Sequence, residues 1–128
     1  MGNNLKGKNI LWVEDDNFLG EVIIEKFREK DAEIIHINSG SKAVESLGQN
    51  TPDLIILDIL LPDKDGFEIL DEIKSDSELS KIPVMVLSNL SQEDTMNKAK
   101  ELGADKFYVK SNLSPDQVVE KAEELLTE

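Results

Sequence analysis

The sequence lacks cysteine and has a single histidine, His36, among its 128 residues. Without thiols the chain forms neither a disulfide framework nor a thiolate metal site, and one histidine is too few for a histidine-rich zinc site. A metal ion would therefore have to bind through oxygen atoms, which are the ligands that hard divalent cations prefer.

Basic residues are also scarce, because 14 Lys and Arg stand against 27 Asp and Glu and leave a formal net charge of −13. An electrostatic field of this sign repels phosphate backbones. We therefore expect no direct binding to nucleic acid.

Long apolar runs are missing as well. The chain begins with the polar segment MGNNLKGKN, which has no hydrophobic signal region. No apolar run approaches the roughly 20 residues needed to span a bilayer. The pattern for N-terminal myristoylation requires Ser or Thr where this chain has Lys6. We expect a soluble, cytoplasmic protein without a membrane partner.

The chain does contain five apolar runs that alternate with five amphipathic segments, a pattern typical of repeated βαβ units with a parallel sheet. We predict strands over Asn9–Val13, Glu33–Ile37, Leu54–Leu57, Pro83–Leu87 and Lys106–Val109. We predict helices over Asn17–Lys30, Ser41–Leu47 and Phe67–Lys74, from Ser91 to Gly103, and from Ser114 onward. Right-handed crossovers place helices on both faces of the sheet. The predicted fold is a three-layer α/β/α sandwich with a doubly wound, five-stranded parallel sheet.

The predicted helices carry apolar residues at three- and four-residue steps, which indicates one core-facing stripe on each. The stripes comprise Phe18, Leu19, Val22, Ile23 and Phe27; Ala43, Val44 and Leu47; Phe67, Leu70 and Ile73; Met96, Ala99 and Leu102; and Val118, Val119, Ala122, Leu125 and Leu126. Ser114 and Gln117 form a capping box at the start of the last helix, and Pro115 suits its first position.

Polar residues follow the predicted strands at their carboxyl ends. They are Glu14, Asp15, Asp16, Asp58, Ser88 and Lys110. Because the carboxyl ends of parallel strands meet at one edge of a sheet, and ligands of open α/β sheets bind there, we expect these residues to converge.

Carboxylates crowded at one edge repel one another unless a cation neutralises them. Mg²⁺, or Mn²⁺ in its place, does so with oxygen ligands. We predict Asp15 and Asp58 as direct ligands, Glu14 as a ligand through water, and the backbone carbonyl of Leu60 as a further ligand. Asp16 is either another ligand or the N-cap of the first helix.

Asp58 is predicted to be a nucleophile that accepts a phosphoryl group, since carboxylates form acyl phosphates. Lys110 and Ser88 would bind the phosphoryl oxygens. A lone Asp at a strand end is more often a turn or capping residue than a phosphoacceptor. The presence of Glu14, Asp15, Ser88 and Lys110 at the other strand ends favours the phosphoacceptor. We read Asp65 as the cap of the third helix and Asp63 as solvated.

Two other residues near these strand ends are read as structural. His36 lies on the second strand and is expected to have no direct role in the site. Trp12, two residues before Glu14, is expected to pack in the core and to report on the site by its fluorescence.

Four segments, ILWVEDD, DILLPDKDG, VMVLSN and LGADKFYVK, together resemble the receiver domain of two-component response regulators. The resemblance covers about Lys8 to Leu126. It implies a flavodoxin-like strand order of 2-1-3-4-5, Mg²⁺ dependence, and phosphoryl transfer to Asp58 from a sensor histidine kinase or phosphotransfer protein. It also implies a switch in which Ser88 moves toward the phosphoryl group and Phe107 turns inward. The face of the fourth helix, fifth strand and fifth helix would then change its affinity for a downstream protein.

The chain departs from the family pattern at two positions. Ser111 follows Lys110 where the family has a proline in a cis bond, and a cis bond before any other residue costs about 2.5 to 4 kcal/mol. We therefore expect a trans or reshaped loop. Asn89 stands where the family has a small residue, and we predict that it narrows access to the phosphoryl group and alters its lifetime.

The sequence thus predicts one receiver domain over residues 1–128, with its core at about 8–126. We expect a single-domain, chemotaxis-regulator-like response regulator that is a monomer or a phosphorylation-dependent homodimer. It would catalyse only its own phosphorylation and dephosphorylation. Three alternatives remain open: a degenerate receiver that binds a partner constitutively, a small metal-dependent phosphatase or phosphotransferase, and the receiver part of a longer regulator.

Overall fold

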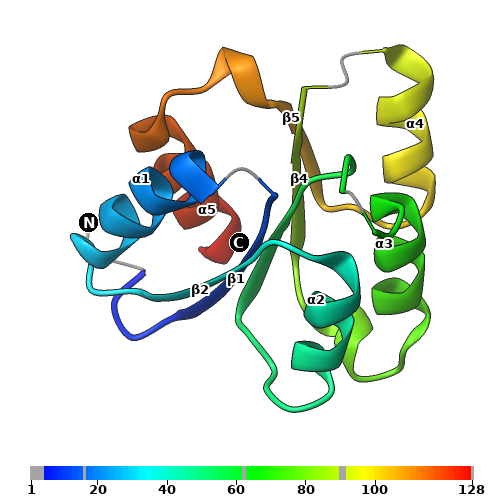
Figure 1. Ribbon diagram of the computed structural model, residues 1–128, viewed down its shortest axis with the longest axis horizontal. Coiled ribbons are helices and arrows are strands. Elements are labelled where there is room, and N and C mark those ends of the chain that lie inside the picture. Colours follow the sequence, from blue (N-terminus) through cyan, green and yellow to red (C-terminus); the bar gives the residue numbers. More distant parts are fainter. Residues whose placement is uncertain (1–4, 16, 62, 90–91, 128) are drawn as a thin grey trace.

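Five parallel strands form the centre of the computed structural model (Figure 1). Residues 5–15, 17–61, 63–89 and 92–127 are described, with the backbone alone for 17–20. The strands are β1 (Asn9–Val13), β2 (Glu33–Ile37), β3 (Leu54–Leu57), β4 (Val84–Ser88) and β5 (Lys106–Val109). The helices are α1 (Asn17–Arg28), α2 (Gly40–Leu47), α3 (Gly66–Ser75), α4 (Glu93–Glu101) and α5 (Pro115–Leu126), with short 3₁₀ helices η1 (Leu79–Lys81) and η2 (Lys110–Asn112).

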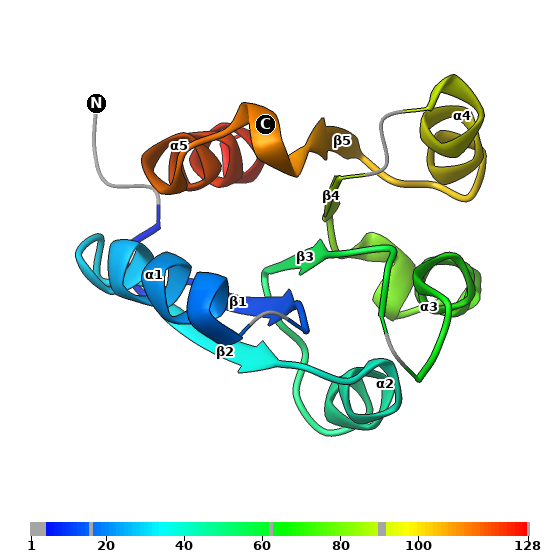
Figure 2. The same ribbon diagram turned by 45° about the horizontal axis from the view of Figure 1, so that its top comes forward.

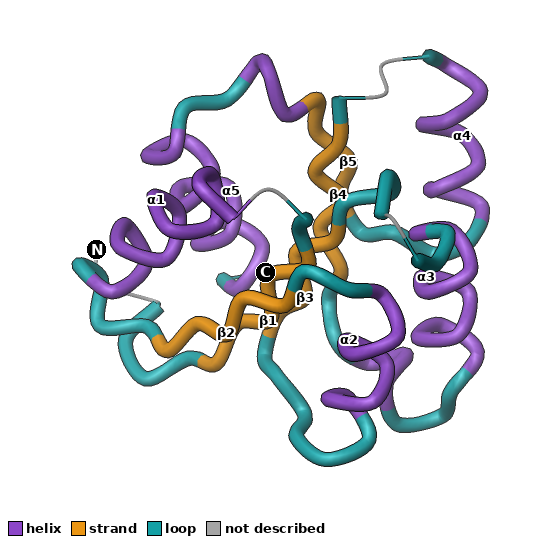
Figure 3. Tube along the Cα trace, in the orientation of Figure 1, coloured by secondary structure: helices purple, strands orange, loops and turns teal. Residues whose placement is uncertain are grey.

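The strand order is β2-β1-β3-β4-β5, which confirms the predicted order 2-1-3-4-5. Helices α1 and α5 cover one face of the sheet, and α2, α3 and α4 lie on the other (Figures 1 and 2). The trace in Figure 3 shows the strands as a central layer between these two sets of helices. None of the described helices has the length and apolar character needed to cross a membrane.

Each face of the sheet has its own hydrophobic core. Trp12, Ile23 and Phe27 belong to the core beneath α1 and α5, whereas Ile69 and Leu70 belong to the core beneath α2, α3 and α4. The four residues of β3 are 0% exposed and contribute to both cores. This burial on two faces explains why β3 is an unbroken apolar run, because each buried Leu or Ile stabilises the fold by roughly 1.5 to 3 kcal/mol.

Several predicted boundaries differ from the structure by one or two residues. Helix α2 begins at Gly40 instead of Ser41, and α3 is one residue longer at each end than predicted. The differences in β4 and α1 have identifiable reasons. Strand β4 begins at Val84 instead of Pro83, which has no N–H for the ladder, and it extends to Ser88, which pairs with Val109. Helix α1 ends at Arg28, before a tight turn that leads to Asp31 at φ 61°.

Among the side chains that the structure describes, the predicted stripes face the core with one exception, while the side chains of Phe18 and Leu19 lie outside that described set. Met96 on α4 is 38% exposed, so the prediction that it faces the core is wrong, although Ala99 on the same helix is 0% exposed. The capping box of Ser114 and Gln117 at the start of α5 is confirmed. The predicted helix start at Ser91 lies outside the described residues, and α4 has Gln92 as its N-cap.

Candidate functional site

Glu14 and Asp58 lie side by side because of the register between β1 and β3. Val13 pairs with Leu57, and the two carboxylate residues follow directly. The Glu14 N–H donates to the Ile37 carbonyl at 3.0 Å, and the Asp58 N–H donates to the Val13 carbonyl at 3.1 Å. Backbone hydrogen bonds thus continue one residue beyond the strands. Both residues are buried, with 1% and 4% of their surface exposed.

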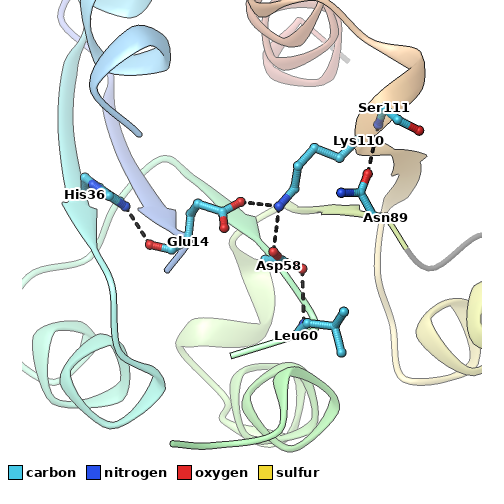
Figure 4. A network of polar contacts seen from close by, with 7 residues as sticks. All are labelled: Glu14, His36, Asp58, Leu60, Asn89, Lys110 and Ser111. Atoms are coloured by element: carbon cyan, nitrogen blue, oxygen red, sulfur yellow. Dashed lines mark hydrogen bonds and ion pairs between the residues drawn. The ribbon is translucent and has the colours of Figure 1, made fainter. Parts of the chain in front are cut away.

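Lys110 bridges these two carboxylates. It is the first residue of η2, directly after β5, and its Nζ contacts Glu14 Oε2 and lies 2.7 Å from Asp58 Oδ2 (Figure 4). Burial lowers the pKa of the Lys110 ammonium, but hydrogen bonds to Asp58 and Glu14 outweigh this effect and leave the pKa above its usual value of 10.5. The bridge therefore places a positive charge between two buried negative ones.

Three carboxylates at this edge are close enough to share a cation. Glu14, Asp15 and Asp58 each offer an oxygen atom, and these atoms lie within 4.8 Å of one another. Asp15 is exposed, whereas the other two are buried. A donor set made only of oxygen atoms and open to solvent on one side fits a hard divalent ion that keeps some of its waters. Asp16 lies outside the described residues.

The loop after β3 holds the second oxygen of Asp58. The Leu60 N–H donates to Asp58 Oδ1 at 3.1 Å. Farther along, the Gly66 N–H donates to the Ile59 carbonyl at 3.0 Å, and a Cβ on Gly66 would lie 2.4 Å from Ile59 Cα. Only glycine allows this approach of α3 to the end of β3. The predicted ligand role of the Leu60 carbonyl remains a prediction.

Two aspartates in the same loop cap helices. Asp65 is the N-cap of α3 and accepts a hydrogen bond from the Phe67 N–H, which confirms the predicted cap. Asp63 was predicted to be solvated, and although exposed it accepts hydrogen bonds from the Gly40 N–H, the Ser41 N–H and the Ser39 hydroxyl. These contacts hold the pKa of Asp63 far below its usual value. Asp63 therefore ties the loop after Asp58 to the start of α2.

His36 makes a contact with the site that the sequence interpretation missed. Its Nε2 lies 2.6 Å from the Glu14 carbonyl oxygen. A carbonyl can only accept, so Nε2 carries the hydrogen. The His36 ring also lies 6.5 Å from the ring of Trp12, its partner in the β1–β2 register. That register, inferred by aligning the two apolar runs, is the sequence signal that would have brought His36 near Glu14.

Ser88 and Phe107, the residues expected to act in the switch, occupy different environments. Ser88 ends β4 and is 0% exposed. Phe107 on β5 is half-buried and packs against the core beneath α2, α3 and α4. Their predicted movements remain predictions.

Asn89 and Ser111, the two departures from the family pattern, contact each other. The Ser111 N–H donates to Asn89 Oδ1 at 3.0 Å (Figure 4). No peptide bond among the described residues is cis, so the bond between Lys110 and Ser111 is trans, as expected. The predicted effect of Asn89 on access to a phosphoryl group remains a prediction.

Comparisons with known proteins place the chain in one family. Residues 10–123 match the response regulator receiver domain family. The chain is 31% identical over 100 residues to the chemotaxis protein CheY of Halobacterium salinarum, covering 78% of this chain and 82% of that protein. It is 38% identical over 104 residues to the response regulator Rcp1 of Synechocystis, covering 74% and 71%.

Solved structures share the fold. The phosphorylated cyanobacterial phytochrome response regulator RcpA is similar with a TM-score of 0.84 and 34% identity over 94% of each chain. The Mn²⁺-bound form of Rcp1 has a TM-score of 0.83 and 35% identity over 91% of each chain. Some relatives are longer, since the chain spans 42% of the transcriptional regulatory protein GltR of Pseudomonas aeruginosa.

Proposed function

The chain belongs to the response regulator receiver domain family, and from this premise we propose that Asp58 accepts a phosphoryl group from a sensor histidine kinase or phosphotransfer protein. The observation that carries the proposal is a carboxylate only 4% exposed at a strand end, with an ammonium 2.7 Å away and two further carboxylates within reach of the same cation. Receiver domains are signalling domains, and this one would act through protein contacts.

In the transfer step, an Asp58 carboxylate oxygen attacks the phosphorus of a phosphohistidine. A P–O bond forms, the P–N bond breaks, and the imidazole leaves with the electron pair of that bond. The Leu60 N–H keeps the Asp58 carboxylate oriented, and Lys110 would bind a phosphoryl oxygen as charge accumulates there. Ser88 would donate its hydroxyl hydrogen to another phosphoryl oxygen.

The acidic cluster and the Mn²⁺-bound relative support binding of a divalent ion. We assign this ion as Mg²⁺, with Asp15 and Asp58 as direct ligands, Glu14 as a ligand through water and the Leu60 carbonyl as a further ligand. The ion would neutralise the negative charge that gathers when a phosphoryl group approaches carboxylates. Asp15, exposed at the rim, would then fix the ion on the solvent side of Glu14 and Asp58.

The remaining parts of the proposal concern partners and setting. Phosphorylation would shift Ser88 and Phe107, and the face of α4, β5 and α5 would then change its affinity for a downstream protein or for a second copy of the chain. Residues 1–128 would act as one receiver domain in the cytoplasm, where the kinase supplies the phosphoryl group.

Intact-mass spectrometry with acetyl phosphate and Mg²⁺ tests the central claim. We expect a gain of one phosphoryl group in the wild-type protein and in Asp71→Asn, a variant of an exposed aspartate on α3, and no gain in Asp58→Asn. Trp12 fluorescence should respond to beryllofluoride in the wild type. The absence of both effects would favour a degenerate binding module, and continuous turnover of a small phosphoester would favour a phosphatase.

A further inference from the structure

The turn that carries Lys110 has no cap of its own. The first N–H groups of a helix lack acceptors within the helix and depend on a side chain, commonly that of the N-cap residue. The N-cap of η2 is Val109, which makes no side-chain hydrogen bond to the turn. Its apolar side chain offers no acceptor, so any side-chain cap of the turn comes from another part of the chain.

Asn89, the residue after the end of β4, supplies that cap. Its Oδ1 accepts the Ser111 N–H at 3.0 Å, across 22 residues of sequence. Asn89 directly follows Ser88, and Ser88 pairs with Val109, so the hydrogen bond lies just beyond the end of the β4–β5 ladder. In Figure 4 the Asn89 carboxamide points toward the Ser111 nitrogen, beside the backbone from which Lys110 extends.

The residue types at positions 89 and 111 are complementary, because one provides a hydrogen-bond acceptor and the other a donor. A proline at position 111 would have no N–H, whereas Ser111 brings a donor that a side-chain acceptor can cap. Asn89 provides an acceptor on a short side chain, and a small apolar residue at that position would not. The hydrogen bond uses the backbone of Ser111, so the Ser111 hydroxyl plays no part in it.

We propose that Asn89 is a positioning residue that caps η2 and thereby holds Lys110 against Asp58. This inference rests on the proposed function, because it concerns the same phosphorylation site. The Lys110 side chain has many rotamers and contacts Glu14 and Asp58 through its terminal Nζ atom. The position of its backbone therefore decides how often the ammonium reaches Asp58.

A well-placed ammonium accelerates both the transfer of the phosphoryl group to Asp58 and its later hydrolysis. On loss of the group, the oxygen of a water molecule forms a bond to phosphorus, and the P–O bond to Asp58 breaks with its electron pair left on the restored carboxylate. Inorganic phosphate leaves with the water oxygen and one of its hydrogens, and the other hydrogen passes to solvent as a proton. Lys110 stabilises charge on the phosphoryl oxygens in this step as it does on transfer. Loss of the Asn89 cap should therefore slow both phosphorylation and dephosphorylation. If Asn89 instead narrows access, Asn89→Ala should accelerate dephosphorylation.

The test compares single variants under the acetyl phosphate assay with saturating Mg²⁺. Asn89→Ala should lower both rate constants by about three- to tenfold, the range expected for one hydrogen bond. Ser111→Ala keeps the N–H and should match the wild type. Asn97→Ala, which removes an exposed carboxamide on α4, is the matched control. The Mg²⁺ dissociation constant should stay unchanged in all three, because the proposed ligands lie on other strands.

A double-variant cycle isolates the hydrogen bond itself. Proline at position 111 removes the donor, and it disturbs Lys110 by a separate steric effect. In the Ser111→Pro background, Asn89→Ala should have no further effect on either rate. An equal effect of Asn89→Ala in both backgrounds, an unchanged rate, or an accelerated dephosphorylation would overturn the inference. If the wild type itself gains no phosphoryl group, the proposed function fails instead.

Discussion

The carboxylate side of the site, at the ends of β1 and β3, and the lysine side, at the ends of β4 and β5, are held by different kinds of contact. Glu14 and Asp58 are buried, and their backbones bond to the adjacent strands. Asn89 and Ser111 are exposed, and a hydrogen bond from the Ser111 N–H to Asn89 Oδ1 joins them. The first side extends the sheet, whereas the second includes a hydrogen bond that joins the residue after β4 to the turn η2.

This difference suggests that one side of the site is rigid and the other can move. A buried carboxylate pair keeps its geometry whether or not a ligand is bound, because moving it would break ladder hydrogen bonds and expose apolar surface. A hydrogen bond between exposed residues can open at a much smaller free-energy cost. The metal-binding side would therefore stay constant while the side that carries Ser88 and Lys110 changes. Lys110 belongs to the second side and contacts Glu14 and Asp58 on the first. A substitution at Lys110 therefore tests how much the first side depends on the second.

The largest effect is expected from Lys110→Met. Removing the ammonium leaves Glu14 and Asp58 as neighbouring buried carboxylates without a cation, and breaking a buried ion pair in this way costs about 3 kcal/mol. Urea denaturation at pH 7 without divalent metal should show a loss of this order. Added Mg²⁺ should recover part of it by supplying positive charge.

A surface ion pair provides the control for this experiment. Lys64 Nζ lies 2.9 Å from Glu72 Oε1, but about half of the Glu72 side chain is exposed. Lys64→Met should therefore have a much smaller effect that Mg²⁺ does not change. If Lys110→Met unfolds at the wild-type urea concentration, the buried carboxylates do not depend on the ammonium, and the comparison between the two sides fails.

An intermediate effect is expected from His36→Ala on the carboxylate side. The lost hydrogen bond to the Glu14 carbonyl frees the peptide between Glu14 and Asp15, and Mg²⁺ affinity measured by calorimetry should fall about tenfold. His36→Gln keeps a side-chain N–H donor of similar reach and should restore most of the affinity. Ile35→Ala, at an exposed neighbour on β2, should bind Mg²⁺ as the wild type does. Wild-type affinity in His36→Ala would show that β2 does not position the ligands.

The smallest effect is expected from Asp63→Asn and depends on pH. The Gly40 N–H, with the Ser41 and Ser39 groups, lowers the pKa of Asp63 below its unfolded value of 3.8. Such a carboxylate stabilises the fold above that value, and the contribution is lost as the pH falls through the lower folded-state pKa. The stability difference between wild type and variant should be constant above about pH 4 and should shrink at lower pH.

Urea midpoints measured from neutral to acidic pH test this expectation. Asp71→Asn serves as the control, because Asp71 accepts only one long hydrogen bond, at 3.4 Å from the Ser75 hydroxyl, among the contacts described. If the difference in urea midpoint between the wild type and Asp63→Asn does not change with pH, the contact of Asp63 with the start of α2 does not depend on the charge of the carboxylate.

Much of the fold followed from the sequence because periodicity reports burial directly. The run Leu54–Leu57 predicted a strand buried on both faces, and Ser114 with Gln117 predicted a helix start. The wrong predictions concern details of packing that hydrophobic periodicity does not report. Met96 follows the helical spacing, yet its position on α4 leaves it partly exposed.

The sequence by itself determined which residue types stand at the strand ends, and parallel strands then gather Glu14, Asp58 and Lys110 at one edge whatever their separation along the chain. Only the tertiary structure decided how the loops hold them. His36 meets Glu14 across 22 residues, Asp63 meets Gly40 across 23, and Asn89 meets Ser111 across 22. The first contact depends on the alignment of β1 with β2, two strands far apart in the sequence. The other two depend on loop conformations, which no local pattern of apolar and polar residues encodes.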